Sequence, residues 1–302
     1  MQNTAEQRPS RLKLVFEKFG RKSLGEKITY IIFFIYFFLT ACVLLYPLIW
    51  AFFNSFKTAE DFFESSFALP REWVFENYLT VFTSFNYRGF TFLDMLWNSL
   101  WITVVRIGVN VMSSVLLAYA VAKFRFPGKS LLYGLVIFTQ TVPIVGSGTA
   151  TYKLLSTLGF VNNPALIWIC WAVGFDFAFI VFYGAFKGVS DFYSESAQID
   201  GANNFIVLVR VVLPQVFPVL IAIAVTQALT VWNDYTFVMI YLRDYPNLSY
   251  GLYLFDKEAG YVANSRPVFF GAVCLSVIPV FVIYACNLKL VLQNVTTGGL
   301  KG

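Results

Sequence analysis

The feature that most constrains this chain is a series of six apolar segments separated by polar ones. They lie at about 28–53, 95–122, 130–152, 164–187, 211–241 and 268–290. Each is near or above the ~20 residues that a helix needs to cross the hydrocarbon core of a bilayer. Only 13% of the residues are charged, against about 25% in soluble domains. The sequence therefore predicts an all-α polytopic membrane protein with six transmembrane helices.

The distribution of Lys and Arg predicts the orientation. Because six is an even number, both termini lie on one side of the membrane. Fourteen basic residues fall on that side and seven on the other, with the first group in the N-terminal segment, the 123–129 loop, the central loop and the tail. The positive-inside rule places that side in the cytoplasm. We expect a cytoplasmic segment at 1–27, a transmembrane domain at 28–290 and a cytoplasmic tail at 291–302.

Several kinds of chemistry are excluded by what the sequence lacks. The chain has no histidine, which removes His-based nucleophile activation and His metal sites. Its four cysteines are scattered through apolar segments without C-x-x-C spacing, so we expect them to pack between helices. No G-x-x-x-x-G-K-[ST] motif occurs. We expect no enzyme activity, no metal site and no cofactor bound by this chain.

The central loop at about 188–210 is too polar for a membrane span. Ser190 or Asp191 can cap a short helix, and Asp200-Gly201 suits a tight turn. Asp191 and Glu195 are like charges four residues apart, so a basic partner from outside would help. We interpret the loop as a short helix–turn–helix on the membrane surface, offered to another protein. An ordinary acidic loop is the alternative.

This loop resembles the EAA motif of binding-protein-dependent ABC importer permeases. Glu195, Asp200-Gly201-Ala202, Pro214 and Pro218 have the residue types and the spacing of that motif, while Ser196 stands where Ala is usual. The resemblance implies a coupling helix between the fourth and fifth spans that docks on a separate ATPase subunit. The residues carried over to that role are Glu195, Ser196, Ala197, Asp200, Gly201 and Ala202.

Three other stretches resemble the carbohydrate-uptake (maltose-type) branch of that family, in particular its shorter permeases. They are S-x-K-T with N-Y in the first external loop, Trp232-Asn233-Asp234 in the fifth span, and T-x-G-G-x-K-G at the end. The resemblance implies a bacterial inner-membrane protein that moves a sugar or oligosaccharide by alternating access. It also implies a second permease, two ATPase subunits that hold ATP–Mg, and an external sugar-binding protein. Gly298, Gly299 and Lys301 would reach the ATPase interface, and a frayed end is the alternative.

Polar and aromatic residues inside the spans are the candidates for the substrate path. Arg106 shares a helix face with Asn98, Asn110 and Ser113/Ser114, and an Arg at the centre of a membrane helix costs about 2.5–3.5 kcal/mol. It should therefore face protein or water, as a structural tie or as a substrate contact. Aromatic faces with carboxylates and amides suit a sugar, although such aromatics can also simply pack. The candidates are Arg106, Trp171, Asp176, Trp232, Asn233 and Asp234.

Other functions stay open on the sequence alone. Arg106, Asp176 and Asp234 are also what an ion-coupled secondary transporter would use as coupling charges. An ABC permease for amino acids or peptides is a further alternative, as is a membrane anchor or receptor without transport activity.

Overall fold

The computed structural model describes residues 22–87, 89–142, 146–259 and 265–298. Almost all of the regular structure in these ranges is helical. The exception is a hairpin of two short strands, β1 (Asn86–Tyr87) and β2 (Phe90–Thr91), in which Asn86 lies opposite Thr91. The fold is thus the predicted all-α one.

Four of the described helical stretches are long and apolar enough to cross a membrane. They are α2 (Leu24–Asn54), α5 (Phe92–Lys123), the continuous run at Asn204–Trp232, and Arg266–Leu288 within α15 (Ser265–Gly298). The run at Asn204–Trp232 consists of α11 (Asn204–Ile206), the π-helix η2 (Val207–Val212) and α12 (Leu213–Trp232). These stretches match the predicted first, second, fifth and sixth spans.

Helix starts follow from local capping. At the start of α5, Thr91 and Asp94 form a capping box, in which the Thr91 hydroxyl and the Asp94 carboxylate each accept a hydrogen bond from the other residue's N–H. Ser23 and Glu26 do the same for α2. These caps start both helices three or four residues before the apolar segments from which they were predicted.

The third and fourth predicted spans are not continuous helices. In the third, α6 (Lys129–Thr141) and α7 (Gly148–Thr157) are separate helices. Pro143, a residue type that favours such a break, lies outside the described residues. In the fourth, α8 (Pro164–Ile167) and the 3-10 helix η1 (Trp168–Trp171) are separated from α9 (Phe177–Gly188). The prediction of an uninterrupted fourth span is wrong because Gly174, at φ +65°, turns the chain.

The fifth predicted span also ends earlier than expected. α12 stops at Trp232, and α13 (Tyr235–Tyr241) begins after a break at Asn233 and Asp234. The Asp234 carboxylate accepts a hydrogen bond from Phe237 N–H at 3.0 Å, which starts the new helix. α14 (Leu248–Ala259) then leads back toward α15. At the other end of the chain, α15 continues through Gly298, so the tail predicted at 291–302 is helical up to that residue.

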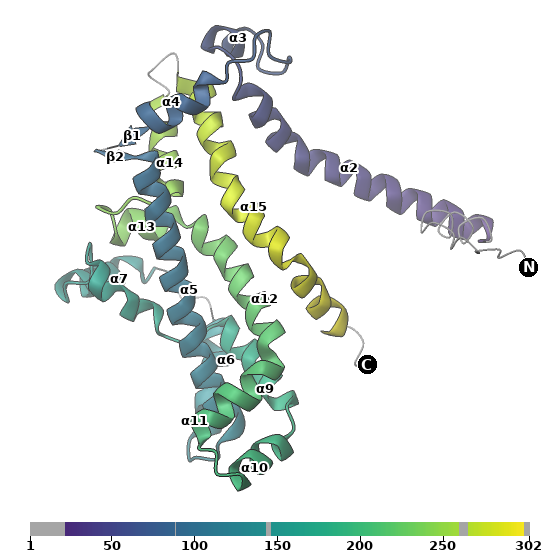
Figure 1. The fold of residues 1–302 in the computed structure, drawn as a ribbon, viewed down its shortest axis with the longest axis vertical. Helices are drawn as coiled ribbons and strands as arrows, with labels where there is room; N and C mark the ends of the chain where they lie inside the picture. The colour runs from purple at the N-terminus through teal and green to yellow at the C-terminus, as the bar shows by residue number, and fades with distance from the viewer. Residues whose placement is uncertain (1–21, 88, 143–145, 260–264, 299–302) are drawn as a thin grey trace, which may run out of the picture.

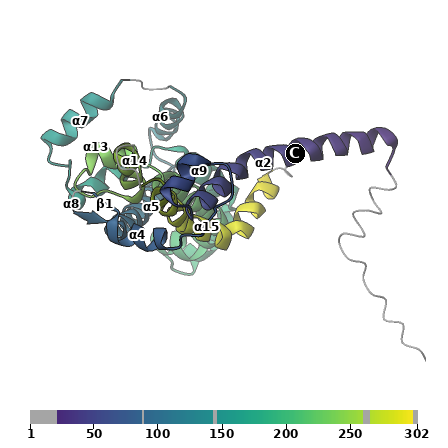
Figure 2. The ribbon, with the colours of Figure 1, turned by 90° about the horizontal axis from the view of Figure 1, so that it is seen from above.

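The helices form an elongated bundle around α5 (Figure 1). The short helices α3 (Ala59–Glu64) and α4 (Glu76–Ser84) lie with α14 at one end, and α10 (Asp191–Ile199) lies with α11 at the other. Figure 2 shows α6 and α7 on one side of the bundle and α2 extending from the opposite side. No residue in the most apolar part of α2 is buried, so this helix needs lipid or another protein around it.

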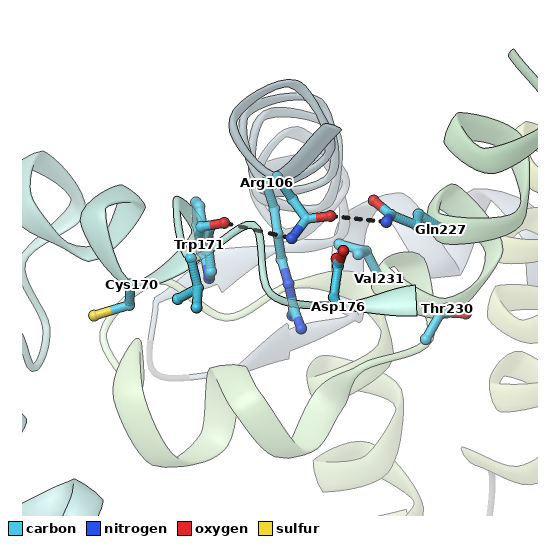
Figure 3. A pocket seen from close by; sticks show the side chains of 9 residues that line it. Arg106, Cys170, Trp171, Asp176, Gln227, Thr230 and Val231 are labelled. Atoms are coloured by element: carbon cyan, nitrogen blue, oxygen red, sulfur yellow. Dashed lines mark hydrogen bonds between the residues drawn. The ribbon is translucent and has the colours of Figure 1, made fainter. Parts of the chain in front are cut away.

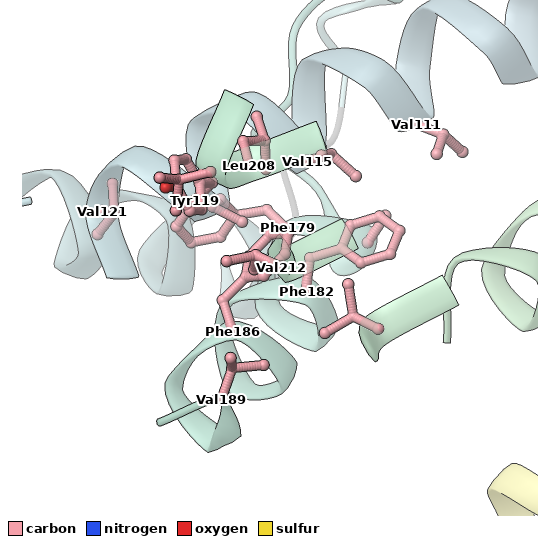
Figure 4. Packing of buried hydrophobic residues seen from close by; sticks show 14 of the residues in the cluster. Val111, Val115, Tyr119, Val121, Phe179, Phe182, Phe186, Val189, Leu208 and Val212 are labelled. Carbon is pink, nitrogen blue, oxygen red and sulfur yellow. The ribbon is translucent and has the colours of Figure 1, made fainter. Parts of the chain in front are cut away.

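The largest core cluster lies in the half of the bundle nearest α10. Val115 and Tyr119 of α5, Phe179, Phe182 and Phe186 of α9, and Val207, Leu208 and Val212 of η2 pack together there (Figure 4). Five of these eight side chains are fully buried. The cluster joins the helices before and after α10 into one packed unit.

The S-x-K-T and N-Y residues of the first loop hold its backbone in place. The Asn77 side-chain amide donates to the carbonyls of Ser55 and Lys57 at 2.8 and 2.9 Å, and the Tyr78 and Ser55 hydroxyls lie 2.8 Å apart. The Lys57 ammonium is buried and donates to Ser65 O at 2.6 Å. Desolvation lowers the pKa of Lys57. These residues therefore lock the loop to the end of α2.

Candidate functional site

A cavity of about 340 Å³ lies against the middle of α5, beside the two helix breaks. Its walls come from α5, η1, the segment between η1 and α9, and α12. The lining residues are Arg106, Asn110, Cys170, Trp171, Val173, Asp176, Gln227, Thr230 and Val231 (Figure 3). Three of the six predicted path residues, Arg106, Trp171 and Asp176, are thus brought together at one cavity.

Arg106 is held by a fourth path residue. Its Nη1 donates to Asp234 Oδ2 at 2.8 Å, and its guanidinium carbon lies 4.8 Å from the centre of the Phe237 ring. Both side chains of the ion pair are 25% exposed. Asp234 therefore compensates the arginine charge while its second oxygen caps α13. The arginine faces protein, as expected, and ties α5 to α13.

Asp176, at the other break, likewise both caps a helix and binds a side chain of α5. Its Oδ1 accepts hydrogen bonds from Phe179 N–H at 3.1 Å and from the Ser114 hydroxyl at 2.9 Å. These bonds start α9 and fix it to α5. Asp176 and Asp234 are therefore each the N-cap of a helix that begins inside the bundle, where the positive end of the helix dipole stabilises the carboxylate.

An amide network crosses the cavity between its two walls. Gln227 Nε2 donates to Asn110 Oδ1 at 2.8 Å, and the Asn110 amide donates to Trp171 O at 3.5 Å (Figure 3). The Trp171 ring is buried against Phe237, and its indole N–H has no hydrogen-bond partner in the described part of the chain. Asn110 was predicted on the polar face of its helix, whereas Gln227 was not among the predicted residues. An amide in the central, apolar part of α12 was the signal that could have found it.

Trp232 and Asn233 lie at a different cavity. This one has a volume of about 420 Å³ and is lined from α12, α14 and α15, with Ser249 and Ser276 among its polar residues. The Asn233 side-chain amide donates to Leu229 O at 2.8 Å. The structure therefore does not bring all six predicted path residues to one place.

The central loop folds as the predicted helix–turn–helix. The Ser190 hydroxyl accepts a hydrogen bond from Phe192 N–H at the start of α10, and Asp200 ends the helix. Gly201 N–H then donates to Gln198 O at 3.0 Å and Ala202 N–H to Ala197 O at 2.9 Å. With Gly201 at φ +87°, this pair of bonds is a Schellman C-cap. Glycine is favoured there because it adopts positive φ without steric cost.

The basic partner expected for Asp191 comes from within the chain and not from outside. Lys123, the last residue of α5, donates from Nζ to Asp191 Oδ1 and to Val189 O, both at 2.6 Å. The Lys123 hydrogen bond and charge lower the pKa of Asp191. This contact fixes the start of α10 to the end of α5.

The outer surface of the loop is apolar and uncovered. Ile199 is 86% exposed, and Phe192, Tyr193 and Phe205 are also exposed beside it. Glu195 lies on this exposed surface of α10 without a hydrogen bond or ion pair to the described residues, while Ser196, Ala197 and Ala202 are half-buried. Soluble surfaces seldom leave such side chains clustered without a partner.

Of the predicted tail residues, Gly298 is the last residue of α15, and Gly299 and Lys301 lie outside the described residues. No group of three or more His, Cys, Asp and Glu side chains that could hold a metal ion occurs among the residues that the structure describes. The cysteine expectation is only partly correct, because Cys170 and Cys274 are half-buried whereas Cys42 and Cys286 are exposed.

Comparison with known proteins gives consistent matches. Residues 110–291 match the family model described as "Binding-protein-dependent transport system inner membrane component". The diacetylchitobiose uptake system permease protein NgcG of Streptomyces coelicolor is 27% identical over 87% of this chain and 86% of its own length. The arabinooligosaccharides transport system permease protein AraQ of Halalkalibacterium halodurans is 23% identical over 87% of this chain and 93% of its own.

A solved structure has the same fold over most of its length. It is a chain of a bacterial ABC transporter involved in the import of the acidic polysaccharide alginate, with a TM-score of 0.74 and 25% identity. The match covers 89% of this chain and 98% of that one.

Proposed function

We propose a function for this chain from the family to which it belongs, that of binding-protein-dependent transport system inner membrane components. Its relatives are permease subunits of ABC transporters and not enzymes. The chain is accordingly a membrane-embedded permease subunit of an ABC importer. We propose that it moves a sugar or oligosaccharide, because relatives covering most of it are named for diacetylchitobiose, arabinooligosaccharides and starch degradation products.

The observation that carries the proposal is that α10 has an exposed outer surface while its inner side is fixed to the helix bundle. The α10 surface presents Glu195 and an uncovered apolar patch around Ile199, while Lys123 and the core cluster fix its inner side to α5, α9 and η2. A force on α10 is therefore transmitted to three helices that wall the cavity or lead to it. Rigid-body rocking of these helices is the motion by which such cavities change the side to which they open.

The proposed topology has six crossings. The four long helices make the first, second, fifth and sixth, and the pairs α6–α7 and α8–α9 make the third and fourth. The described residues around the α6–α7 break are exposed in this chain, so another subunit would have to cover the broken backbone, because lipid cannot hydrogen-bond to it. Both termini and α10 would then lie in the cytoplasm of a bacterial cell, as the distribution of basic residues indicates. The segments would be 1–27, 28–290 with the coupling loop at about 188–210, and 291–302.

Partners follow from what the chain does not supply. Its sequence has no nucleotide-binding motif, so two ATPase subunits would bind ATP–Mg and grip α10, with Gly298, Gly299 and Lys301 near their interface. A second permease would complete the cavity, and an external sugar-binding protein would deliver substrate. A solved alginate importer in complex with a periplasmic protein shares the fold of this chain, with a TM-score of 0.60.

Within this chain, the candidate path is the cavity at Arg106, Trp171 and Asp176, with Trp232 and Asn233 at the neighbouring one. An ion-coupled transporter is not favoured, because Arg106 and Asp234 neutralise each other and Asp176 caps a helix. An ABC permease for amino acids or peptides is not favoured either, since the relatives are named for saccharides.

Transport by reconstituted proteoliposomes distinguishes these alternatives. We expect uptake of labelled oligosaccharide only when both permeases, the ATPase, the binding protein and ATP are present. Uptake by this chain alone under a proton or sodium gradient would contradict the proposal.

A further inference from the structure

A pocket of about 330 Å³ lies between the start of α6 and the last turns of α9, apart from both cavities already described. It is lined by Phe126, Gly128, Lys129, Ser130, Tyr133 and Tyr183. The pocket is at the same end of the bundle as α10, because Lys129 and Arg125 act electrostatically on Asp191. No transport role described above uses these residues.

The charge around this pocket is strongly positive. Lys129 donates from Nζ to Phe124 O at 3.1 Å and Ala122 O at 3.4 Å, and Lys187 lies 5.4 Å from the centre of the Tyr183 ring. Neither ammonium has a carboxylate within ion-pair distance in the described part of the chain. Asp191, on which Lys129 acts electrostatically, is paired with Lys123. The two lysines therefore retain charge for a ligand.

Two tyrosines form the wall between these lysines. The rings of Tyr133 on α6 and Tyr183 on α9 pack at 4.6 Å between centroids. Neither phenol hydroxyl hydrogen-bonds to the residues that the structure describes. Tyrosines with free hydroxyls beside lysines are typical of the headgroup level of a bilayer, where a ring is buried and its hydroxyl is wet.

The side of α6 that faces away from the pocket is apolar. Leu131, Leu135 and Phe138 share one face of the helix and are 67%, 50% and 60% exposed. At about 3.6 residues per turn this face lies roughly opposite to Lys129 and Tyr133, which line the pocket. It needs lipid or another protein around it, which places α6 at the edge of the bundle.

We propose that this pocket binds the headgroup of an anionic phospholipid, with Lys129, Lys187 and the two tyrosine hydroxyls around the phosphate. The proposal rests on the proposed function in one respect, which is that this end of the bundle lies at the cytoplasmic leaflet, where anionic lipids attract basic pockets between helices. The bound lipid would hold α6 against α9 and so support the unit that carries α10.

Native mass spectrometry of the whole importer, purified in detergent and titrated with phosphatidylglycerol or phosphatidylcholine, tests the proposal. We expect phosphatidylglycerol to be retained in preference to phosphatidylcholine. Because each basic residue near a membrane surface contributes about 1 kcal/mol to binding, Lys129→Gln and Lys187→Gln should each weaken it about fivefold. Lys153→Gln, on exposed α7 and outside the pocket, is the matched control and should change nothing.

Several outcomes would overturn the assignment. Equal retention of both lipids, or an equal loss in Lys153→Gln, would show that no specific headgroup site exists. Full competition by glycerol 3-phosphate would indicate a site for a soluble phosphate, and cross-linking of Lys129 to another subunit in place of lipid would indicate a protein interface. Lys187→Gln keeps the test valid if Lys129→Gln disturbs the end of α5. ATP-driven uptake, measured after the same preparation is reconstituted into proteoliposomes, separates a failure of the lipid site from a failure of the transport function.

Discussion

Replacing Gly201 by Ala affects the backbone conformation of the turn that follows α10 and little else. Gly201 has φ +87°, and a Cβ added there meets no heavy atom within 4 Å. The cost is therefore conformational, about 1–2 kcal/mol for an L-residue in the left-handed region. Asn adopts this region more readily than other L-residues, so Gly201→Asn should cost less.

This cost converts into a measurable loss of coupling. A penalty of 1–2 kcal/mol lowers the ratio of native to non-native turn conformations by a factor of about 5–30. If α10 transmits the movement of an ATPase to the transmembrane helices, uptake per ATP hydrolysed should fall in Gly201→Ala by up to that factor. The fall should be smaller in Gly201→Asn. Insertion and assembly should stay normal, because the turn is exposed and no core side chain moves.

The assay measures oligosaccharide uptake and ATP hydrolysis in the same proteoliposomes of the reconstituted importer. An unchanged ratio of uptake to hydrolysis in Gly201→Ala would refute the reasoning. Equal defects in Gly201→Asn and Gly201→Ala would also refute it, because they would indicate a role for the missing side chain and not for the backbone.

Three further changes test other contacts. Gly174→Ala combines φ +65° with a Cβ at 3.1 Å from α5 backbone atoms, so, unlike Gly201→Ala, it should lower the yield and thermal stability of the purified complex. Asp234→Ala removes both the ion pair with Arg106 and the cap of α13, at a cost of about 1–3 kcal/mol in stability. Asp234→Asn keeps a cap acceptor, so its loss of stability in thermal denaturation should be smaller. An equal loss in the two variants would argue against the cap. Lys123 lowers the folded-state pKa of Asp191. The contact should therefore be complete at neutral pH and be lost only as the pH falls below the ordinary pKa of Asp and through the lowered pKa. A spin label on α10 should become mobile in that acid range, and already at pH 7 in Lys123→Met.

Features that depend on neighbouring residues were predictable from the sequence. The second span was placed within three residues of α5, and the helix–turn–helix around Gly201 formed as expected, because caps and positive-φ glycines act within a few positions. The break between η1 and α9 was missed because the apolar character of the segment masks Gly174, whose turn packs on α5.

Contacts between segments that are distant in the sequence could not be predicted from it. Lys123 and Asp191 are 68 residues apart, and Arg106 and Asp234 are 128 apart. The sequence indicated that Arg106 and Asp191 need a partner, but which residue pairs with each is set by how α5 packs against α9 and α12. The same packing separates Trp232 and Asn233 from the cavity at Trp171, although all three were grouped by residue type.

The central claim is that α10 is the surface to which an ATPase subunit binds. Site-specific photo-cross-linking from position 199 in the assembled importer tests it most directly, because Ile199 is the most exposed large apolar side chain of the loop. Phe63 on α3, at the opposite end of the bundle and also exposed, is the matched control position. The account predicts a cross-link to the ATPase subunit from position 199 and none from position 63. A cross-link from position 199 to the external binding protein, or to no protein at all, would contradict it.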